Sequence, residues 1–277
     1  MRRRKLISTT LLTILGVLIS LFAAIPFLWM VSNSLKLRSE VLSWPPVLIP
    51  KSPQFVNFLD AMKEIDIPRL VGNTMTIVFW VLILQVTSSV LVAYGFARYR
   101  VKGSKLLFYV LLATMMLPWV VTMVPAYTIF LKLNWVGTYL PLIVPSIGGS
   151  AFYIFMLRQF IMGIPRELDE AAKIDGCGDL KILFRIILPL CKPILGTLVI
   201  FSFTSTWSDF IGPSFYITNN DLFTFSLGLQ AFRGLNSTMP WHTAMAACVI
   251  FSLPMVLIFF LAQNVFTRGI TMTGLKG

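Results

Sequence analysis

The sequence predicts an all-α polytopic membrane protein with six transmembrane helices, and two observations lead to this fold class. First, only 12% of the 277 residues are charged and 57% are hydrophobic, whereas an average soluble domain has about 25% charged residues. Second, the apolar residues form long charge-free stretches, and about 20 such residues are needed to cross a bilayer. A soluble enzyme, a disordered chain and a disulfide scaffold are therefore excluded as classes of protein.

Six stretches are the candidate spans. The first follows a basic segment at the N-terminus and exceeds the apolar part of a signal peptide, so we expect a retained helix. The fifth is short and continues past a single acid, Asp209, toward Asn220. The six stretches without Asp, Glu, Lys or Arg are residues 6–35, 70–97, 106–131, 133–157, 193–208 and 234–267.

Lysine and arginine set the expected orientation. With the N-terminus in the cytoplasm, the cytoplasmic segments hold more than twice as many of these residues as the outer segments. Because positive loops stay inside, both termini are predicted to be cytoplasmic. The net charge of +12 then needs no nucleic acid to explain it.

The chain is predicted to be one transmembrane domain over residues 1–277, with long segments between its spans. Residues 36–69 lie outside and carry a short amphipathic helix near 55–65. Prolines in the middle spans indicate kinks, caused either by packing or by irregular backbone that lines a cavity. The other segments are a cytoplasmic loop at 158–192, an outer loop at 217–241 and a cytoplasmic tail at 268–277.

The loop at 158–192 contains the most informative pattern. Pro165 and the acids after it suit the first turn of a helix, and Gly176 suits its end. A second helix is expected from Asp179 to Ile187, ending at Leu188-Pro189. Its apolar positions, which fall on one face at helical spacing, are Leu180, Leu183, Phe184 and Ile187.

An acid beside two small residues stands on the first of these helices: Glu170, Ala171 and Ala172. Small side chains let another surface approach the backbone, and a carboxylate pairs with a partner's arginine. This helix is too polar to enter lipid, so we expect it to contact a cytoplasmic protein.

These residues resemble a known family. Glu170-Ala171-Ala172, then three residues, Gly176, and later Ile187 with Leu188-Pro189 resemble the EAA motif of ABC importer permeases. Ile187 is the eleventh residue after Gly176. Two further similarities to the family are Leu117-Pro118 with Val124-Pro125 and the run Trp207-Ser208-Asp209-Phe210, in which Ser208 stands where Asn is commoner. The ending at 268–277 is similar to that of the carbohydrate-uptake subfamily, specifically its six-span maltose-type subunit.

The resemblance implies a type I ABC importer permease in a bacterial inner or plasma membrane. It implies a heterodimer with a second homologous permease, two copies of an ABC ATPase, and an extracytoplasmic solute-binding protein that delivers a sugar. ATP and Mg would be bound by the ATPases, because this chain has no phosphate-binding G-x4-G-K-[ST] motif. We expect no enzyme activity, cofactor or metal site in the chain itself. The expected ATPase-coupling residues are Glu170, Ala171, Ala172, Asp175, Gly176, Ile187, Leu188 and Pro189.

The resemblance also suggests three further sites. Asp209, too costly to expose to lipid, is expected in the translocation path or at its gate, bonded to nearby backbone, to the partner permease or to a sugar. Asn219, Asn220 and Asp221 are expected either to contact the binding protein or to form a lid. Trp207, Pro118 and Pro125 are also assigned to the path. The tail residues Gly274, Leu275, Lys276 and Gly277 are expected either to lie between the ATPases or to form a frayed end.

Two alternatives remain for the cargo and the driving force. A phosphorylated cargo such as glycerol 3-phosphate would need basic residues within the spans, which have none. An ion-coupled secondary transporter would need intramembrane ionisable residues, and only Asp209 qualifies. A neutral sugar or oligosaccharide driven by ATP is therefore the favoured expectation.

Overall fold

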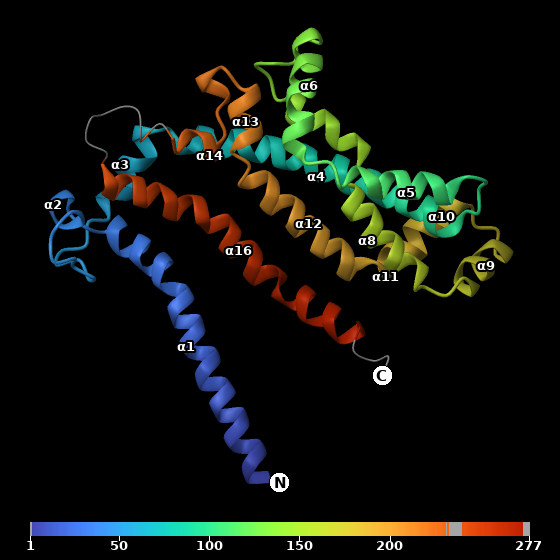
Figure 1. Cartoon of the computed structure of the whole chain (residues 1–277), viewed down its shortest axis with the longest axis horizontal. Coiled ribbons are helices and arrows are strands. Elements are labelled where there is room, and N and C mark those ends of the chain that lie inside the picture. The colour runs from blue at the N-terminus through green and yellow to red at the C-terminus, as the bar shows by residue number, and fades with distance from the viewer. Residues whose placement is uncertain (1, 231, 233–239, 274–277) are drawn as a thin grey trace. The chain divides into compact units, whose positions relative to one another are not determined.

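The computed structural model describes residues 2–230, 232 and 240–273, and only the backbone of 2–9 and 262–273. Every regular element in these ranges is helical (Figure 1). The elements are α1 (Arg2–Ser34), α2 (Arg38–Val41), α3 (Val56–Glu64), α4 (Ile67–Arg98), α5 (Ser104–Thr114), α6 (Trp119–Lys132), α7 (Leu140–Ile143), η1 (Val144–Gly148), α8 (Ala151–Met162), α9 (Glu167–Ile174), α10 (Asp179–Ile182), η2 (Leu183–Ile187), α11 (Leu188–Leu190), α12 (Lys192–Trp207), α13 (Ile211–Tyr216), η3 (Asn220–Leu222), α14 (Phe225–Gly228) and α16 (Trp241–Thr273).

Four helical stretches in the described part of the chain are long and apolar enough to cross a membrane. Two further pairs of helices are bent, by 96° between α5 and α6 and by 82° between the α10–α11 run and α12. The number of spans therefore rises to six if each bent pair is one span. The four stretches are Thr10–Ser34, Ile67–Arg98, Leu140–Met162 and Trp241–Leu261.

The chain forms two compact units, the first made of residues 1–68 and 228–253. In this unit the segment after α1 folds back on the end of that helix. The side-chain amide of Asn57 donates to the backbone carbonyls of Ser34 and Lys36, each at 2.9 Å. The Lys36 ammonium donates to Asn33 at 2.7 Å and lies over the Trp29 ring. The predicted short amphipathic helix is present as α3.

The second unit, residues 69–227 and 254–277, has its core around α4. Buried side chains of α4, α8, α12 and the 164–191 segment form one cluster there. Polar contacts also join α4 to its neighbours: Ser202 of α12 donates to Gln85 at 2.8 Å, and the backbone N–H of Ser150 donates to Ser89 at 3.1 Å. Within a bilayer, such interhelical hydrogen bonds satisfy polar groups that lipid cannot.

Prolines account for some of the breaks but not for all of them. Pro118 stands between α5 and α6, where its missing N–H and extended conformation stop the first helix. Pro125 is tolerated inside α6. Pro189 does not end its helix as predicted, because it occupies the first turn of α11, where no intrahelical N–H is needed. The bend follows at Cys191 instead.

Two helical stretches differ in extent from the charge-free stretches of the sequence. The fourth apolar stretch becomes helical only at Leu140, after a turn in which Asn134 and Gly137 have positive φ, and it continues to Met162. The last long helix begins at Trp241 and its backbone stays helical to Thr273, beyond the predicted start of the tail. Charge-free composition marks what lipid tolerates, but it does not mark where the backbone turns.

A glycine allows close contact between α4 and the turn just before α8. Gly149 has φ +71°, and a Cβ there would lie 3.0 Å from Ser89 Oγ and 3.2 Å from its backbone nitrogen. We expect Gly149→Ala to reduce stability by about 1–3 kcal/mol, because the conformation and the contact both disfavour a side chain. Thermal unfolding of the purified protein measures this, with Gly148→Ala, which has open space, as the control. Equal melting of the two variants would contradict the packing argument.

Candidate functional site

The helix that carries the acid and the small residues is formed as predicted. α9 has Glu167, Asp169 and Glu170 in its first turn, where the positive end of the helix favours acids. Gly176 adopts φ +76° just beyond it and lets the chain reverse. Gly178 then precedes the run of α10, η2 and α11.

The predicted coupling residues divide between the surface and the core. Glu170, Ala171, Asp175, Gly176 and Pro189 are exposed, and Leu188 is half-buried. Ala172 and Ile187 are buried, so Ala172 packs inside the unit and does not present its methyl group to a partner. The exposed part of the motif is therefore smaller than its full sequence.

The second helical run also differs from the prediction. Leu183 and Ile187 are buried together with Ile182, whereas Leu180 and Phe184 are exposed. The wider π turn of η2 changes the register, so regular helical spacing from Leu180 does not hold. Exposed apolar side chains therefore lie on the same segment as exposed Glu170. These side chains are Leu168, Ile174, Leu180 and Phe184.

A buried ion pair that the sequence did not predict joins the end of α4 to α9. Arg98 Nε, from the last residue of α4, lies 2.6 Å from Asp169 Oδ2 of α9, and their side chains are only 7% and 12% exposed. Removing one partner of such a pair typically costs about 3–5 kcal/mol, because the other charge stays buried. Asp169 stands beside Glu170 in sequence, and spacing alone does not separate a buried acid from an exposed one.

Polar groups around this pair connect both parts of the segment to the end of α4. Lys173 and Asp179 form an exposed ion pair at 3.3 Å. The Tyr99 hydroxyl donates to the Asp179 carboxylate, and this hydrogen bond raises the pKa of Tyr99 to about 12. A small cleft of about 120 Å³ lies between these side chains. The group contains as many acids as bases, so it does not favour an anionic ligand.

Asp209 lies between two cavities at the other end of α12. The first, of about 280 Å³, is lined by hydroxyls of Thr74, Ser205, Thr206 and Thr224 together with apolar side chains. The second, of about 460 Å³, is lined mainly by aromatic and apolar side chains. Its lining includes Trp119, Phe130, Phe215 and Tyr216.

The Asp209 carboxylate also holds the local backbone. Its Oδ1 accepts a hydrogen bond from the Gly212 N–H at 3.1 Å, at the start of α13. A Cβ on residue 212 would lie 2.5 Å from Asp209 Oδ2, so only glycine fits. Bonding to neighbouring backbone was one of the expected arrangements for this side chain.

The other expected path residues lie elsewhere. Trp207 is fully buried, with its ring stacked on Phe203 at 5.8 Å and edge-on to Phe225 at 6.2 Å. Its aromatic face is therefore used inside the unit. Pro118 and Pro125 are exposed and line neither cavity, whereas Pro141 and Pro145 line the larger one. Gly274 to Gly277 lie outside the described residues.

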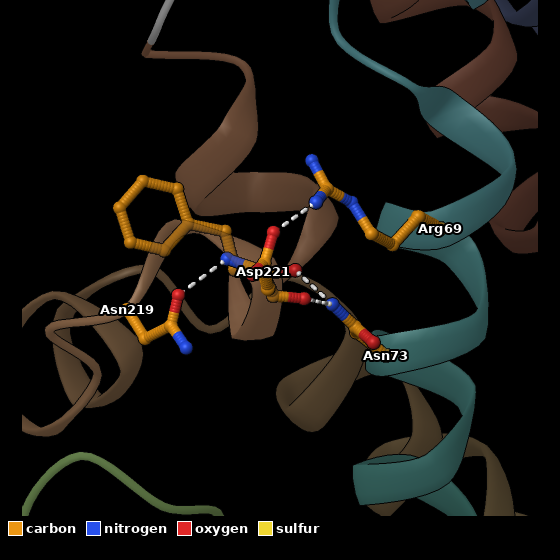
Figure 2. A network of polar contacts seen from close by, with 5 residues as sticks. Arg69, Asn73, Asn219 and Asp221 are labelled. Carbon is orange, nitrogen blue, oxygen red and sulfur yellow. Dashed lines mark hydrogen bonds and ion pairs between the residues drawn. The ribbon is translucent and has the colours of Figure 1, made fainter.

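The loop after α13 is held against α4 by a network of polar contacts (Figure 2). Arg69 pairs with the Asp221 carboxylate, and the Asn73 amide donates to the carbonyls of Asp221 and Phe223 at 2.8 and 2.9 Å. Asn219 accepts from the backbone N–H of Asp221 at 2.9 Å. The loop is thus folded and fixed, and Asn219 and Asn220 stay exposed on it.

Two more bonds continue this network to the cavities. Thr74 Oγ1 accepts from the Phe225 N–H at 2.8 Å, and Ser226 Oγ donates to the Asp209 carbonyl. Residues 219–226, which we call the clamp loop, therefore join the first part of α4 to Asp209. No cluster of metal-binding side chains occurs among the residues searched, which are those described.

Comparison with known proteins identifies the family. The sequence pattern of the family described as binding-protein-dependent transport system inner membrane component matches residues 85–272. The chain is 31% identical over 282 residues to the arabinooligosaccharides transport system permease protein AraQ of Halalkalibacterium halodurans, covering all of this chain and 99% of AraQ. It is also 31% identical over 280 residues to the melibiose/raffinose/stachyose import permease protein MelC of Bacillus subtilis, covering all of both chains.

The fold has a solved counterpart. A chain of a bacterial ABC transporter that imports the acidic polysaccharide alginate superimposes with a TM-score of 0.84, covering 95% of this chain and 98% of that one at 19% identity. At this identity the similarity concerns the fold alone. The family pattern covers most of the chain, including α9, the larger cavity and Asp209. The chain belongs to the family of binding-protein-dependent ABC transporter inner membrane components, and it is a transport subunit rather than an enzyme.

Proposed function

We propose that the chain is one of two different permease subunits of a type I importer that carries a neutral sugar or oligosaccharide. In this proposal it crosses the bacterial membrane six times, each bent helix pair being one span, with both termini in the cytoplasm. Two copies of an ABC ATPase bind ATP and Mg below it, and a solute-binding protein delivers the sugar from outside. Membership of the family is the observation that carries this proposal.

The cargo is proposed from the relatives and from the cavities. AraQ and MelC are named for the transport of oligosaccharides. The cavities beside Asp209 are lined by hydroxyls, aromatic rings and one carboxylate, with no lysine or arginine. Aromatic faces pack on apolar sugar faces and carboxylates accept hydroxyl hydrogen bonds, so this lining suits a neutral sugar better than a phosphate ester.

Coupling to ATP is proposed to occur through segment 158–192. Its exposed Glu170 and the apolar side chains around it form the surface on which an ATPase subunit docks. Glu170 offers a charge-assisted hydrogen bond to an arginine of that subunit. The tail residues Gly274 to Gly277 are proposed to lie between the two ATPases.

The extracytoplasmic side of the chain, which includes the clamp loop, is proposed to receive the sugar. Asn219 and Asn220 are exposed at the start of the clamp loop and contact the binding protein, while Asp221 anchors the loop on α4. Asp209, Pro118 and Pro125 belong to the path or its gate. Trp207 is proposed to support that gate from inside the unit, since its ring is fully buried.

The transport proposal is tested by identifying the solute-binding protein and its ligand. We expect a solute-binding protein to co-purify with the assembled complex. Neutral oligosaccharides should raise its melting temperature, because a ligand at 100 times its Kd stabilises the folded binding protein by about 2.7 kcal/mol. Loaded binding protein should then stimulate ATP hydrolysis by the reconstituted complex. Stabilisation by glycerol 3-phosphate, with no response to sugars, would contradict the proposed cargo.

Glu170→Lys tests the docking surface. The variant should reach the membrane normally, because residue 170 is exposed. It should lose ATPase subunits or coupled transport, since a lost charge-assisted hydrogen bond is worth about 1.5–3 kcal/mol. Pull-down of the ATPase with the permease measures this, with Glu167→Gln as a neighbouring control. Full retention of the ATPase and normal transport would rule out a docking role for this acid.

Asp209 is tested by two substitutions of similar size. Asp209→Asn keeps an acceptor for the Gly212 N–H, so we expect assembly and at least partial transport. Asp209→Leu removes the acceptor and should reduce transport much further, because losing a buried hydrogen-bond partner costs about 1–3 kcal/mol. Sugar uptake into proteoliposomes compares the two. Equal uptake by both variants would show that the carboxylate has neither role.

A further inference from the structure

The end of α4 is joined to the proposed ATPase-docking segment by more than one contact. The Arg98–Asp169 ion pair is buried and closes at 2.6 Å. Neither Asp169 Oδ1 nor Arg98 Nε makes a hydrogen bond among the described residues, so the pair is not fully satisfied. Because a buried pair of this kind is weak evidence for stability, its better-attested use is to specify one arrangement of the elements that it joins.

Two arginines exchange backbone contacts around this pair. Arg98 of α4 donates to the carbonyl of Ile164 at 3.1 Å, just before α9. In the opposite direction, Arg166 donates to the carbonyl of Ala97 at 3.2 Å, in the last turn of α4. A cation near the C-terminus of a helix also binds its unpaired carbonyls. Each element thus holds the backbone of the other.

The same helix carries the clamp loop near its other end. Asn73 and Thr74 bond to residues 221–225, and Ser226 bonds to the Asp209 carbonyl. α4 has 32 residues, which corresponds to about 48 Å of helix at 1.5 Å per residue. It has no break, whereas the spans formed by α5–α6 and by α10–α12 are bent by 96° and 82°.

We propose that Arg98 and Asp169 are positioning residues that make α9 and α4 move as one body, so that displacement of the docking segment is carried along α4 to the clamp loop and Asp209. This inference rests on the proposed docking of an ATPase on segment 158–192. The buried pair transmits the movement within the chain, whereas the exposed Glu170 faces the ATPase. The pair acts through α4 and has no contact with the sugar.

Neutral variants of the pair test this role. Arg98→Gln and Asp169→Asn should still co-purify with ATPase subunits, because Glu170 and the exposed apolar side chains are unchanged. The ratio of binding-protein-stimulated to basal ATP hydrolysis should fall by about tenfold, within the usual range of coupling between distant sites. Arg100→Gln removes the same charge from an exposed position two residues away and should keep the ratio.

The combined variant Arg98→Asp with Asp169→Arg restores the opposite charges in exchanged positions. It should raise the ratio above that of either corresponding single charge reversal, which a general loss of stability would not do. A normal ratio in both neutral variants, with ATPase subunits retained, would overturn the proposal. If every variant of the segment, Glu170→Lys included, retained the ATPase subunits, that result would instead contradict the docking proposal.

A distance measurement tests whether α4 and α9 move as one body, even if the charge variants fail to assemble. Spin labels on cysteines introduced at Arg100 and Glu167, in a chain whose native cysteines are replaced, report the spacing between the ends of α4 and α9. Between the nucleotide-free and ATP-trapped complex, the spacing should change by less than about 2 Å, the scale of ordinary helix shifts. A larger change would show that the two helices move separately and would overturn the proposal.

Discussion

The rest of the second unit depends on one constraint, which is that α4 stays a continuous helix and keeps polar partners along its whole length. Arg98 and Ala97 bond to the segment around α9, Gln85 and Ser89 bond to α12 and the start of α8, and Asn73 and Thr74 bond to the clamp loop. In lipid, each of these polar groups would be costly without its partner. The helix therefore has polar partners at both ends and in the middle, while the α5–α6 pair and the run from α10 to α12 are bent.

This arrangement separates two kinds of acid on one short helix. Glu170 is exposed and available to another protein, whereas Asp169, the preceding residue, is buried against Arg98. In the proposed function the exposed acid serves recognition between proteins, whereas the buried acid bonds within the chain. At the other end, Asp221 and Asp209 show a similar division, since the first anchors a loop and the second lines cavities.

Much of the fold could be predicted from the sequence, because lipid selects charge-free stretches and caps mark helix ends. The existence of α9, the left-handed Gly176 and the short helix α3 were predicted correctly for this reason. The π turn at η2 and the burial of Ala172 and Trp207 could not be predicted, because they depend on which neighbours pack there. The Arg98–Asp169 pair joins residues far apart in sequence, and composition carries no signal for such a contact.

Hydrogen exchange in the clamp loop tests the central claim most directly, namely that events at segment 158–192 are transmitted through α4. The amides of residues 219–226 would be followed in the complex in lipid discs, without nucleotide and with ATP trapped on the ATPases, in the absence of binding protein. The account predicts that trapping changes exchange in the clamp loop as well as in segment 158–192. A change confined to segment 158–192, with exchange at 219–226 unaltered, would contradict it.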